Sequence, residues 1–379
     1  GPGAELPDKF IPYEEFVSQG NDQGDVLDLP PDALAILMYT SGSTGFPKGV
    51  MLSHSNLIEN IHQGAQVWPN DQTDISYACV PMNHIYGVLG FHETCYFGSK
   101  MILVPPFDPI KTLEHMTEYK VTVSGLVPTM IIMLMHFYDP AKHSLKSMKY
   151  LVSAGAPLAE ETLKKAQEMF GVKLFHGYGC TEAGPTIARQ RPDGKFKVGS
   201  VGPAIPGLAM KLVDDDGREV PQGETGEIIV KGPGVMKGYW NKPKETAETL
   251  RDGWLHTGDL GRLDEDRELY IVGRKKDLII KGGENIDPGV SENILAKHPA
   301  VFMAATIAIP DAKYGEEVGA AVILQPGQKV TEEELLKYAA EHVHHFVAPK
   351  RIFIMNTFPM TGTGKILKRE IREIVKGMM

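Results

Sequence analysis

Short apolar runs alternate with amphipathic segments through the first half of the chain. The apolar runs predict buried strands at residues 33–38, 77–81, 101–104, 121–127, 150–153 and 174–176. Segments with apolar residues three or four positions apart predict helices at 110–119, 129–138 and 159–170, with a further helix beginning near Asn56. Strands that alternate with helices are typical of an α/β fold with a substantially parallel sheet.

The segment that follows residue 53 shows the helix signal in detail. Leu57, Ile58 and Ile61 are expected to share one face of the helix, and Ser53 or Ser55 is a suitable N-cap. The longest apolar run, 130–135, is expected to be a core element, because a membrane span needs about 18 consecutive apolar residues.

From Val198 onward the pattern changes to short strands separated by Asp, Gly and Pro turns. Strands are predicted at 198–207, 211–213, 227–231 and 268–272, which together indicate an antiparallel β subdomain. The C-terminal region predicts a small α/β unit with strands at 320–324 and 351–355. Its helix is expected to begin after Thr331, which can form a capping box with Glu334.

Composition narrows the class of protein. The 379 residues are 42% hydrophobic and 23% charged, which is ordinary for a globular protein with room for two or more domains. The formal net charge of −9 argues against a broad nucleic-acid interface. Cys79, Cys95 and Cys180 are widely spaced and indicate neither a disulfide framework nor a metal site. Without a recognisable secretion signal, we expect a cytoplasmic protein.

The residues from Thr40 to Gly49 carry the strongest chemical signal, reading Thr-Ser-Gly-Ser-Thr-Gly-Phe-Pro-Lys-Gly. Glycine lets a backbone turn sharply near a ligand, and exposed N–H groups, hydroxyls and a lysine suit phosphate oxygens. A Gly-rich loop between a strand and a helix is the usual setting for a phosphate cradle. It is not a Walker A motif, because only two residues separate Gly42 from Gly45. The alternative is a flexible, solvated loop.

Several later positions combine a turn or strand end with chemically useful side chains. His84 follows a predicted strand, Thr181 and Glu182 follow another, Asp259 ends a Gly-containing turn, and Lys365 stands on a Gly/Thr loop. Each also has an ordinary structural explanation, namely a capping histidine, a helix cap, an Asx-turn and a surface lysine. A carboxylate such as Glu182 can bind Mg²⁺, and a lysine on a loop can bring positive charge into a cleft.

Taken in this order, the motifs resemble those of the adenylate-forming superfamily, and in particular its acyl- and aryl-CoA synthetases. The resemblance covers almost all of residues 33–370, with at least five motifs in the family's order. Family members normally carry a further region, about one domain in length, before the first motif. Only a short segment precedes Thr40 here, so the chain resembles a family member truncated at its N-terminus or completed by a second chain.

The resemblance implies a set of nucleotide-binding positions. These are Thr40, Ser41, Gly42, Ser43, Thr44, Gly45, Lys48, Gly155, Ala156, Pro157, Tyr178, Gly179, Asp259, Ile271 and Arg274. By the same resemblance, Tyr178 offers its ring to adenine, Thr181 hydrogen-bonds the α-phosphate, and Asp259 accepts from the ribose hydroxyls. Glu182 is the implied Mg²⁺ ligand.

The remaining implied positions concern the acid, the thiol and the movement between two half-reactions. The acyl pocket is expected at His84, Tyr86, Ala154 and Gly177, and the thiol side at Lys281, Gly282 and Gly283. Lys365 matches the family's catalytic lysine. Lys276 matches the hinge between a large domain (1–273, with 198–273 as its β subdomain) and a small mobile domain (274–379).

The implied activity is that of an AMP-forming acid–thiol ligase, which uses ATP, Mg²⁺ and coenzyme A. Small residues at the expected pocket favour an apolar fatty, aryl or alicyclic acid over an amino acid. Three alternatives stay open: loading of a carrier protein, oxidation of the adenylate as in luciferases, and a non-catalytic nucleotide-binding remnant.

Two departures from the family pattern fall in or near the small domain. After Asn285-Ile286 the family usually has an aromatic residue, Pro, any residue, then Glu-Ile/Val-Glu, and only Pro288 and Glu292 are kept here. The family's Asp-Gly-Tyr turn near residue 267 is replaced by Arg267-Glu268. We expect both to affect the docking of the small domain more than the adenylate chemistry.

Overall fold

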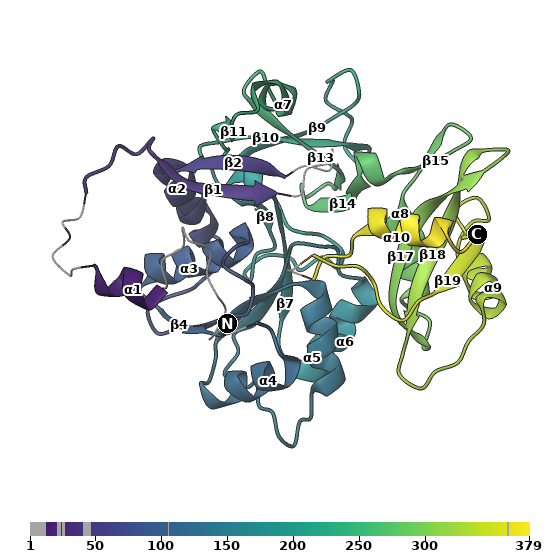
Figure 1. The fold of residues 1–379 in the computed structure, drawn as a ribbon, viewed down its shortest axis with the longest axis horizontal. Coiled ribbons are helices and arrows are strands. Elements are labelled where there is room, and N and C mark those ends of the chain that lie inside the picture. Colours follow the sequence, from purple (N-terminus) through teal and green to yellow (C-terminus); the bar gives the residue numbers. More distant parts are fainter. Residues whose placement is uncertain (1–12, 21–23, 25–26, 41–46, 105, 362–363) are drawn as a thin grey trace.

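Four β-sheets and the helices between them make up the described part of the chain (Figure 1). The computed structural model describes residues 13–20, 24, 27–40, 47–104, 106–361 and 364–379. Three of the sheets form a large body, and the fourth forms a smaller body that contains the C-terminus. The mixed α/β fold expected from the sequence is confirmed.

The six-stranded sheet has the order β4-β3-β5-β6-β7-β8, in which the first five strands are parallel and β8 is antiparallel. Its strands are β3 (Ile75–Ala78), β4 (Lys100–Leu103), β5 (Val123–Leu126), β6 (Tyr150–Ser153), β7 (Leu174–Gly179) and β8 (Thr186–Arg189). Its connecting helices are α3 (Ile85–Phe97), α4 (Pro109–Glu118), α5 (Pro128–Phe137) and α6 (Glu160–Phe170). The predicted parallel sheet is thus confirmed. Helix α3 was not predicted, because its own apolar residues do not recur with a helical period.

Both faces of this sheet are covered by helices, which explains why its strands are mostly apolar and do not alternate between apolar and polar residues. Helices α4, α5 and α6 cover one face, where they pack against Leu151. Helices α3 and α2 (His54–Ala65) cover the other face, where they pack with Tyr150. Successive residues of β6 therefore serve two separate cores, as the alternation of a strand requires.

Helix α2 begins where the sequence predicts. The backbone N–H of Asn56 donates to Ser53 Oγ at 3.2 Å, and the N–H of Ser53 donates to Asn56 Oδ1 at 3.0 Å, which completes a capping box. Leu57 and Ile61 are buried, whereas Ile58 is 60% exposed. The prediction for Ile58 is wrong because it lies about 100° around the helix from Leu57.

The loop with the Thr40–Gly49 motif connects two strands. Strands β1 (Leu34–Thr40) and β2 (Lys48–Ser53) pair antiparallel, and β11 (Gly238–Tyr239) adds to β2. The expectation of a helix directly after this loop is wrong, because residues 48–53 pair with β1 along their length and α2 begins only afterwards. Residues 41–46 lie outside the described residues.

An antiparallel sheet follows, as predicted. It contains β9 (Ala209–Val213), β10 (Thr225–Lys231), β12 (Leu250–Arg251), β13 (Trp254–Leu263) and β14 (Leu269–Arg274), and α7 (Pro243–Thr249) precedes β12. The predicted strand at 198–207 is wrong. Only Ala204 makes an isolated bridge there, because three glycines with positive φ and two prolines interrupt the segment.

The smaller body confirms the predicted α/β unit. Its elements are β15 (Ile279–Lys281), β16 (Glu284–Ile286), α8 (Pro288–Leu295), β17 (Val301–Asp311), β18 (Gly315–Leu324), α9 (Glu332–His342), β19 (Arg351–Ile354) and α10 (Lys368–Lys376). The capping box of Thr331 and Glu334 is present at the start of α9. One departure from the family pattern also has a local role, since Asp287 accepts a hydrogen bond from the Gly289 N–H at 2.7 Å and caps α8.

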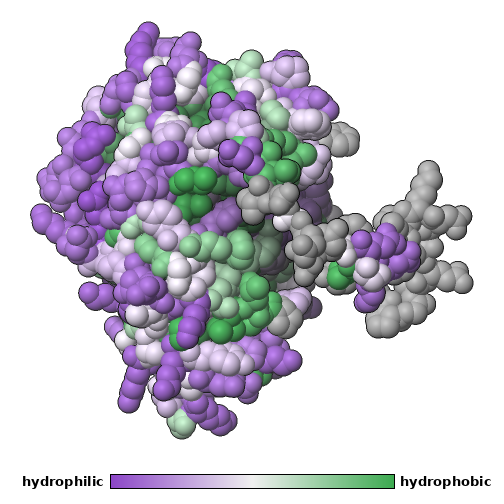
Figure 2. All heavy atoms as spheres, turned by 90° about the vertical axis from the view of Figure 1, so that its left-hand side faces the viewer, coloured by the Kyte–Doolittle hydropathy of each residue, from purple (hydrophilic) through white to green (hydrophobic). Residues whose placement is uncertain are grey.

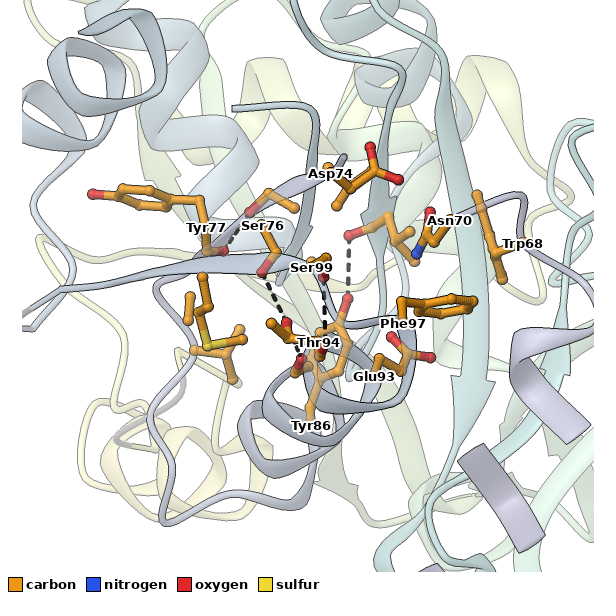
Figure 3. Close-up of a pocket in the computed structure, with 18 of the residues that line it drawn as sticks. Trp68, Asn70, Asp74, Ser76, Tyr77, Tyr86, Glu93, Thr94, Phe97 and Ser99 are labelled. Carbon is orange, nitrogen blue, oxygen red and sulfur yellow. Dashed lines mark hydrogen bonds between the residues drawn. The ribbon is translucent and has the colours of Figure 1, made fainter. Parts of the chain in front are cut away.

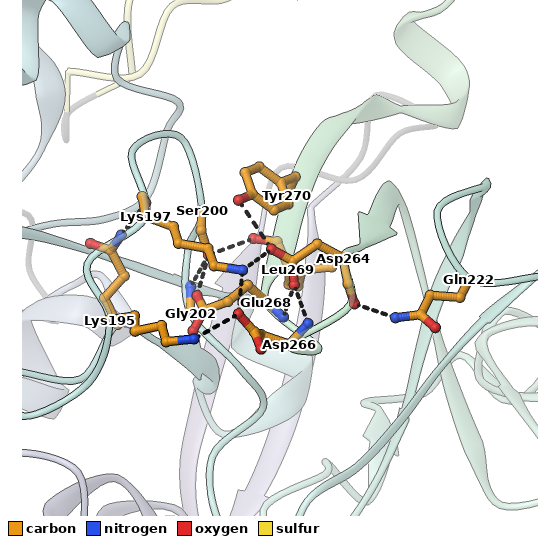
Figure 4. Close-up of polar contacts among 11 residues, drawn as sticks. Lys195, Lys197, Ser200, Gly202, Gln222, Asp264, Asp266, Glu268, Leu269 and Tyr270 are labelled. Atoms are coloured by element: carbon orange, nitrogen blue, oxygen red, sulfur yellow. Dashed lines mark hydrogen bonds and ion pairs between the residues drawn. The ribbon is translucent and has the colours of Figure 1, made fainter.

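The second departure fastens a turn within the large body (Figure 4). Arg267 takes a left-handed φ of 61° in the turn between β13 and β14, and Ser200 Oγ donates to Glu268 Oε2 at 2.6 Å. Lys197 contacts Asp264 and Asp266 of the same turn at 2.6 and 2.7 Å. All of these contacts join the turn to the 197–200 segment of the large body. They give no support to the expectation that Arg267-Glu268 affects docking of the small domain.

Apolar side chains are exposed on the face shown in Figure 2, which includes α2, α3 and β4. Ile58, Phe91, Tyr96 and Leu103 are each at least 44% exposed, and β4 is an edge strand. Such a grouping marks a contact surface more often than an ordinary surface. None of the described helices combines the length and the apolar character needed to cross a bilayer.

Asn60 ties α2 to the turn that follows β7, and it supplies a test of the fold. Its side chain is fully buried, donates to the Ala183 and Thr186 carbonyls at 3.1 and 2.9 Å, and accepts from the Thr186 N–H at 3.0 Å. We expect Asn60→Ala to lower the free energy of unfolding by about 2–4 kcal/mol, because buried backbone groups lose their partners.

Urea unfolding measures this effect. The matched control is Gln66→Ala at the exposed end of the same helix, which should change the free energy by less than about 0.5 kcal/mol. If the two variants were equally stable, the proposed role of Asn60 would be wrong.

Candidate active site

The smaller body reaches the larger one through the segment that carries Lys365. Thr129 Oγ1, on α5, donates to the Gly364 carbonyl at 3.2 Å. Gly364 has a φ of +80°, and a Cβ atom there would lie 2.5 Å from Thr129 Oγ1, so this approach requires glycine. The docked backbone places Lys365 at the edge of the parallel sheet, close enough to influence His84.

Asp259 is the centre of a hydrogen-bonded group at this edge. Tyr178 Oη, from β7, donates to Asp259 Oδ2 at 2.8 Å, and Arg274 Nε contacts Oδ1 at 2.8 Å. Asp259 and Arg274 are opposite one another in the β13–β14 register, which explains their pairing. Asp259 is only 5% exposed, yet each of its oxygens has a further lone pair for a ligand hydroxyl.

Lys365 occupies a desolvated and largely cationic environment. Burial lowers its pKa to about 8, and the positive charges of Arg274 and Lys276 act in the same direction. The carboxylates of Asp259 and Asp277 partly oppose this change. An anion that bound here would stabilise the ammonium form, so the site favours negatively charged ligands.

His84 caps the N-terminus of α3 and faces the same region. Its Nδ1 accepts a hydrogen bond from the Tyr86 N–H at 3.1 Å, which assigns the remaining proton of the neutral ring to Nε2. Burial lowers the pKa of His84, and the charge of Lys365 lowers it further. The neutral ring can therefore donate from Nε2 to an anionic oxygen.

Glu182 lies in a 3₁₀ turn, η1 (Thr181–Ala183), directly after β7. Tyr239 Oη donates to Glu182 Oε1 at 2.9 Å, and Lys48 Nζ lies 4.7 Å from the centre of the Tyr239 ring. The pairing of β11 with β2 brings Tyr239 beside Lys48. The contact of Tyr239 with Glu182 was not predicted from the sequence, because it depends on this long-range pairing of strands. An aromatic residue in the Gly-Tyr-Trp run was its only local signal.

A group of basic side chains from different elements surrounds this space. Lys276, in η2 (Lys275–Asp277), has its pKa lowered first by burial and then by Arg274, and Lys48 adds to this effect. Together with Lys365 these groups form a connected region of positive charge. Such a region is suited to a polyphosphate.

The described residues contain no group of three or more His, Cys, Asp or Glu side chains that could hold a metal ion. A single carboxylate is nevertheless enough for Mg²⁺ that is shared with substrate phosphates, because this ion keeps several waters. Glu182 offers hard oxygen, and the hydrogen bond from Tyr239 fixes its orientation. The donor set therefore fits Mg²⁺ and would not fit a metal that needs a closed protein cage.

The structure brings two further predicted turns to this edge. Residues 154–157 follow β6 and residues 177–179 end β7, and these strands are parallel neighbours. A Cβ on Gly177 would find no atom closer than 3.8 Å, so this glycine leaves space, whereas one on Gly179 would lie 2.0 Å from the Pro185 carbonyl. Ile271 is half-buried on β14. Burial raises the pKa of Cys180 well above its usual value, which argues against a nucleophilic role.

The thiol-side positions lie within the smaller body. Lys281 is 3% exposed, contacts Glu317 Oε1 at 2.5 Å and donates to the Phe346 carbonyl at 2.9 Å. Gly282 and Gly283 follow with positive φ in the β15–β16 turn. The predicted positions Ser41, Gly42, Ser43, Thr44 and Gly45 lie outside the described residues. The flanking Thr40 and Lys48 are paired across β1 and β2.

A pocket with a cavity volume of about 90 Å³, partly open to solvent, lies between α3 and one face of the parallel sheet (Figure 3). Tyr86 lines it, and its hydroxyl donates to the Val152 carbonyl at 3.3 Å. Of the predicted acyl residues, only Tyr86 lines this pocket, and His84 lies two residues before it.

Comparisons with known proteins agree with this arrangement. Two family models match the chain, "AMP-binding enzyme" over residues 5–240 and "AMP-binding enzyme C-terminal domain" over residues 291–365. The chain is similar to a long-chain-fatty-acid–CoA ligase of Bacillus subtilis (strain 168), with 40% identity over 349 residues that cover 91% of this chain. The chain spans 62% of that relative's length.

Two further comparisons extend the match. A feruloyl-CoA synthase of an Amycolatopsis species is 38% identical over 350 residues, which cover 91% of this chain and 71% of the relative. The crystal structure of ATP-bound MatB from Rhodopseudomonas palustris superposes with a TM-score of 0.87 at 35% identity, covering 93% of this chain and 70% of that one. The similarity thus includes both bodies of the molecule.

The environment of Lys365 supplies a direct test of the site. We expect Lys365 to titrate near pH 8, well below the usual range of an exposed lysine side chain. The pH dependence of lysine acetylation, resolved residue by residue by mass spectrometry, measures this. Arg274→Gln should raise the pKa of Lys365, because it removes a neighbouring positive charge. Titration of Lys365 together with the exposed lysines would contradict its desolvation.

Proposed function

The chain belongs to the family of AMP-binding enzymes, and from this premise we propose that it is an AMP-forming acid–thiol ligase. It activates an apolar fatty, aryl or alicyclic acid with ATP to give acyl-AMP and pyrophosphate, and then transfers the acyl group to coenzyme A. The observation that carries the proposal is the convergence of Lys365, His84 and the Tyr178–Asp259–Arg274 group. Two of the relatives are named as a long-chain-fatty-acid–CoA ligase and a feruloyl-CoA synthase, which supports an acid of this class.

The AMP half of the nucleotide is held by the Asp259 group. Asp259 accepts from the ribose hydroxyls with its free lone pairs, and Arg274 keeps the carboxylate in place while adding positive charge. Tyr178 presents its ring to adenine beside the turn 154–157. The hydroxyl of Thr181 donates to the α-phosphate at the start of η1.

The acid meets the nucleotide between His84 and Lys365. His84 Nε2–H orients the carboxylate, and one carboxylate oxygen attacks the α-phosphorus while the bond to pyrophosphate breaks. Lys365 lies where negative charge builds on both partners, so its ammonium stabilises the transition state more than the reactants. The enzyme contributes mainly position and charge.

The departing pyrophosphate leaves toward Lys48. Mg²⁺, when it is bound by Glu182, supplies charge neutralisation on this side. Tyr239 orients Glu182, and its ring holds the Lys48 ammonium nearby. Together these residues bind the leaving group without forming a covalent bond to it.

The second half-reaction requires a different arrangement of the two bodies. Rotation about Lys276, between residues 1–273 and 274–379, withdraws Lys365 and brings the turn of Gly282 and Gly283 to the acyl-AMP. The thiol of coenzyme A then attacks the acyl carbon, and AMP leaves. Lys281 positions this turn through its buried contacts with Glu317 and Phe346. A phosphopantetheinyl carrier in place of coenzyme A would test the alternative acceptor.

The two half-reactions separate the role of Lys365. We expect Lys365→Ala to slow acid-dependent ATP–pyrophosphate exchange by about 10²–10⁴-fold, because it removes charge stabilisation from the adenylation transition state. Thioester formation from supplied acyl-AMP should change by less than about threefold. Lys329→Ala, on the exposed surface of the same body, is the matched control. An equal loss of rate in both half-reactions would contradict the proposed role of Lys365 in adenylation.

The pH dependence of adenylation supplies a second test. Adenylation needs the protonated ammonium, and the pKa of Lys365 is about 8, so kcat/KM should be constant below pH 7 and fall as the pH rises through 8. Lys365→Arg should lose this decline, because a guanidinium stays protonated. Stopped-assay profiles from pH 6 to 10 measure both enzymes. A decline of the same midpoint in Lys365→Arg would assign the titration to another group.

A further inference from the structure

The far end of the α3 pocket is polar, although its walls are mostly apolar. Small residues make the space. At Gly90 on α3, the nearest atom to an added Cβ would be Met101 Cε at 4.0 Å. Side chains of α3 spaced three or four residues apart, from Tyr86 to Phe97, line one side of the pocket. Glu93 is the charged member of this row, and it lies beside Phe97, Trp68 and Asn70 in Figure 3.

Glu93 forms an ion pair with Arg189 in the pocket wall. Arg189 Nη1 lies 2.6 Å from Glu93 Oε1, and the two side chains are only 8% and 19% exposed. The guanidinium of Arg189 lies against Gly64 of α2, where an added Cβ would be 3.3 Å from Nη1, so this glycine leaves room for it. The pair is neutral overall, and the nearby Asp74 is already balanced by Lys149 at 2.8 Å.

Two polar atoms at this end have hydrogen-bonding capacity to spare. Trp68 is 4% exposed, and its Nε1–H has no hydrogen-bond partner among the described residues. Glu93 Oε1 accepts no hydrogen bond within the described part of the chain, in spite of the charge of Arg189 beside it. Trp68 and Glu93 both line the pocket; the buried Trp68 donor has no partner, which is unusual in a folded protein, and among the described residues the only close contact of Glu93 Oε1 is Arg189 Nη1.

From this geometry we infer that the acid taken by the pocket carries a hydroxyl group at its far end, recognised by Trp68, Glu93 and Arg189. The inference rests on the proposed function, which places the carboxylate at His84. The helical rise from His84 to Glu93 is about 13 Å, so the chain would have about ten carbons or an equivalent length.

A hydroxyl fits better than the other possible ends. It can both accept from Trp68 Nε1–H and donate to Glu93, whereas a carbonyl oxygen could only accept. A second carboxylate would meet the Glu93 carboxylate, and the balanced ion pair offers it no excess positive charge. A plain alkyl end would remove the pocket from water and leave the Trp68 Nε1–H without a partner.

Binding of inert acyl-AMP mimics tests this without turnover. The full chain is titrated calorimetrically with three acyl sulfamoyl-adenosines, whose acyl groups are decanoyl, 10-hydroxydecanoyl and acetyl. We expect the hydroxydecanoyl compound to bind at least tenfold more tightly than the decanoyl compound. Equal or reversed affinities would overturn the inference and leave the proposed function intact. Failure of all three to bind would overturn the proposed function and the inference with it.

Two variants show whether the named residues are responsible. The double variant E93L/R189M removes both charges together, so no unpaired charge is left in the pocket. It should bind the decanoyl compound better than the hydroxydecanoyl compound, while its affinity for the short acetyl compound stays within about twofold of the parent chain. Trp68→Phe, a milder change, should lower the hydroxyl preference several-fold. An unchanged preference in both variants would overturn the assignment.

Discussion

The ion pair between Asp259 and Arg274 organises the charges of the site. It forms because the two residues are opposite one another on adjacent strands, and Tyr178 extends it to the edge of the parallel sheet. Without the carboxylate of Asp259, only Asp277, of the described carboxylates, would offset the combined positive charge of Arg274, Lys365 and Lys276. The pair therefore lets several positive charges gather in a partly desolvated space, which suits the binding of a polyphosphate chain.

Docking of the smaller body completes this arrangement and also makes it reversible. In the described part of the chain, Lys365 is positioned by a hydrogen bond from the Thr129 side chain to the Gly364 carbonyl, and not by an ion pair of its own. A contact of this kind costs little to break, whereas the buried Lys281–Glu317 pair lies inside the smaller body and can move with it. The geometry is thus compatible with a rigid-body rotation about the short turn at Lys276, which exchanges one set of residues at the acyl group for another.

The sequence predicted those features that depend on local patterns. Hydrophobic periodicity was sufficient for the parallel sheet. A serine ahead of the apolar positions was sufficient for the N-cap of α2, and the Thr–Glu spacing was sufficient for the capping box of α9. Hydrophobic periodicity did not predict α3, because the apolar residues of this helix are spread around it and do not form one face. Short glycine-containing motifs supplied most of the predicted site positions, since a close backbone approach needs glycine. The contributions of Tyr239, Glu93 and Arg189 could not be predicted, because each depends on a partner distant in the sequence.

The central claim is that these residues activate a carboxylic acid as an adenylate. Exchange of labelled pyrophosphate into ATP, measured with the folded chain and with separate pools of fatty, aryl and alicyclic acids, tests it most directly. The account predicts exchange that depends on ATP, on Mg²⁺ and on the acids of one pool. Absence of exchange with every pool, in protein that is folded and binds ATP, would contradict it.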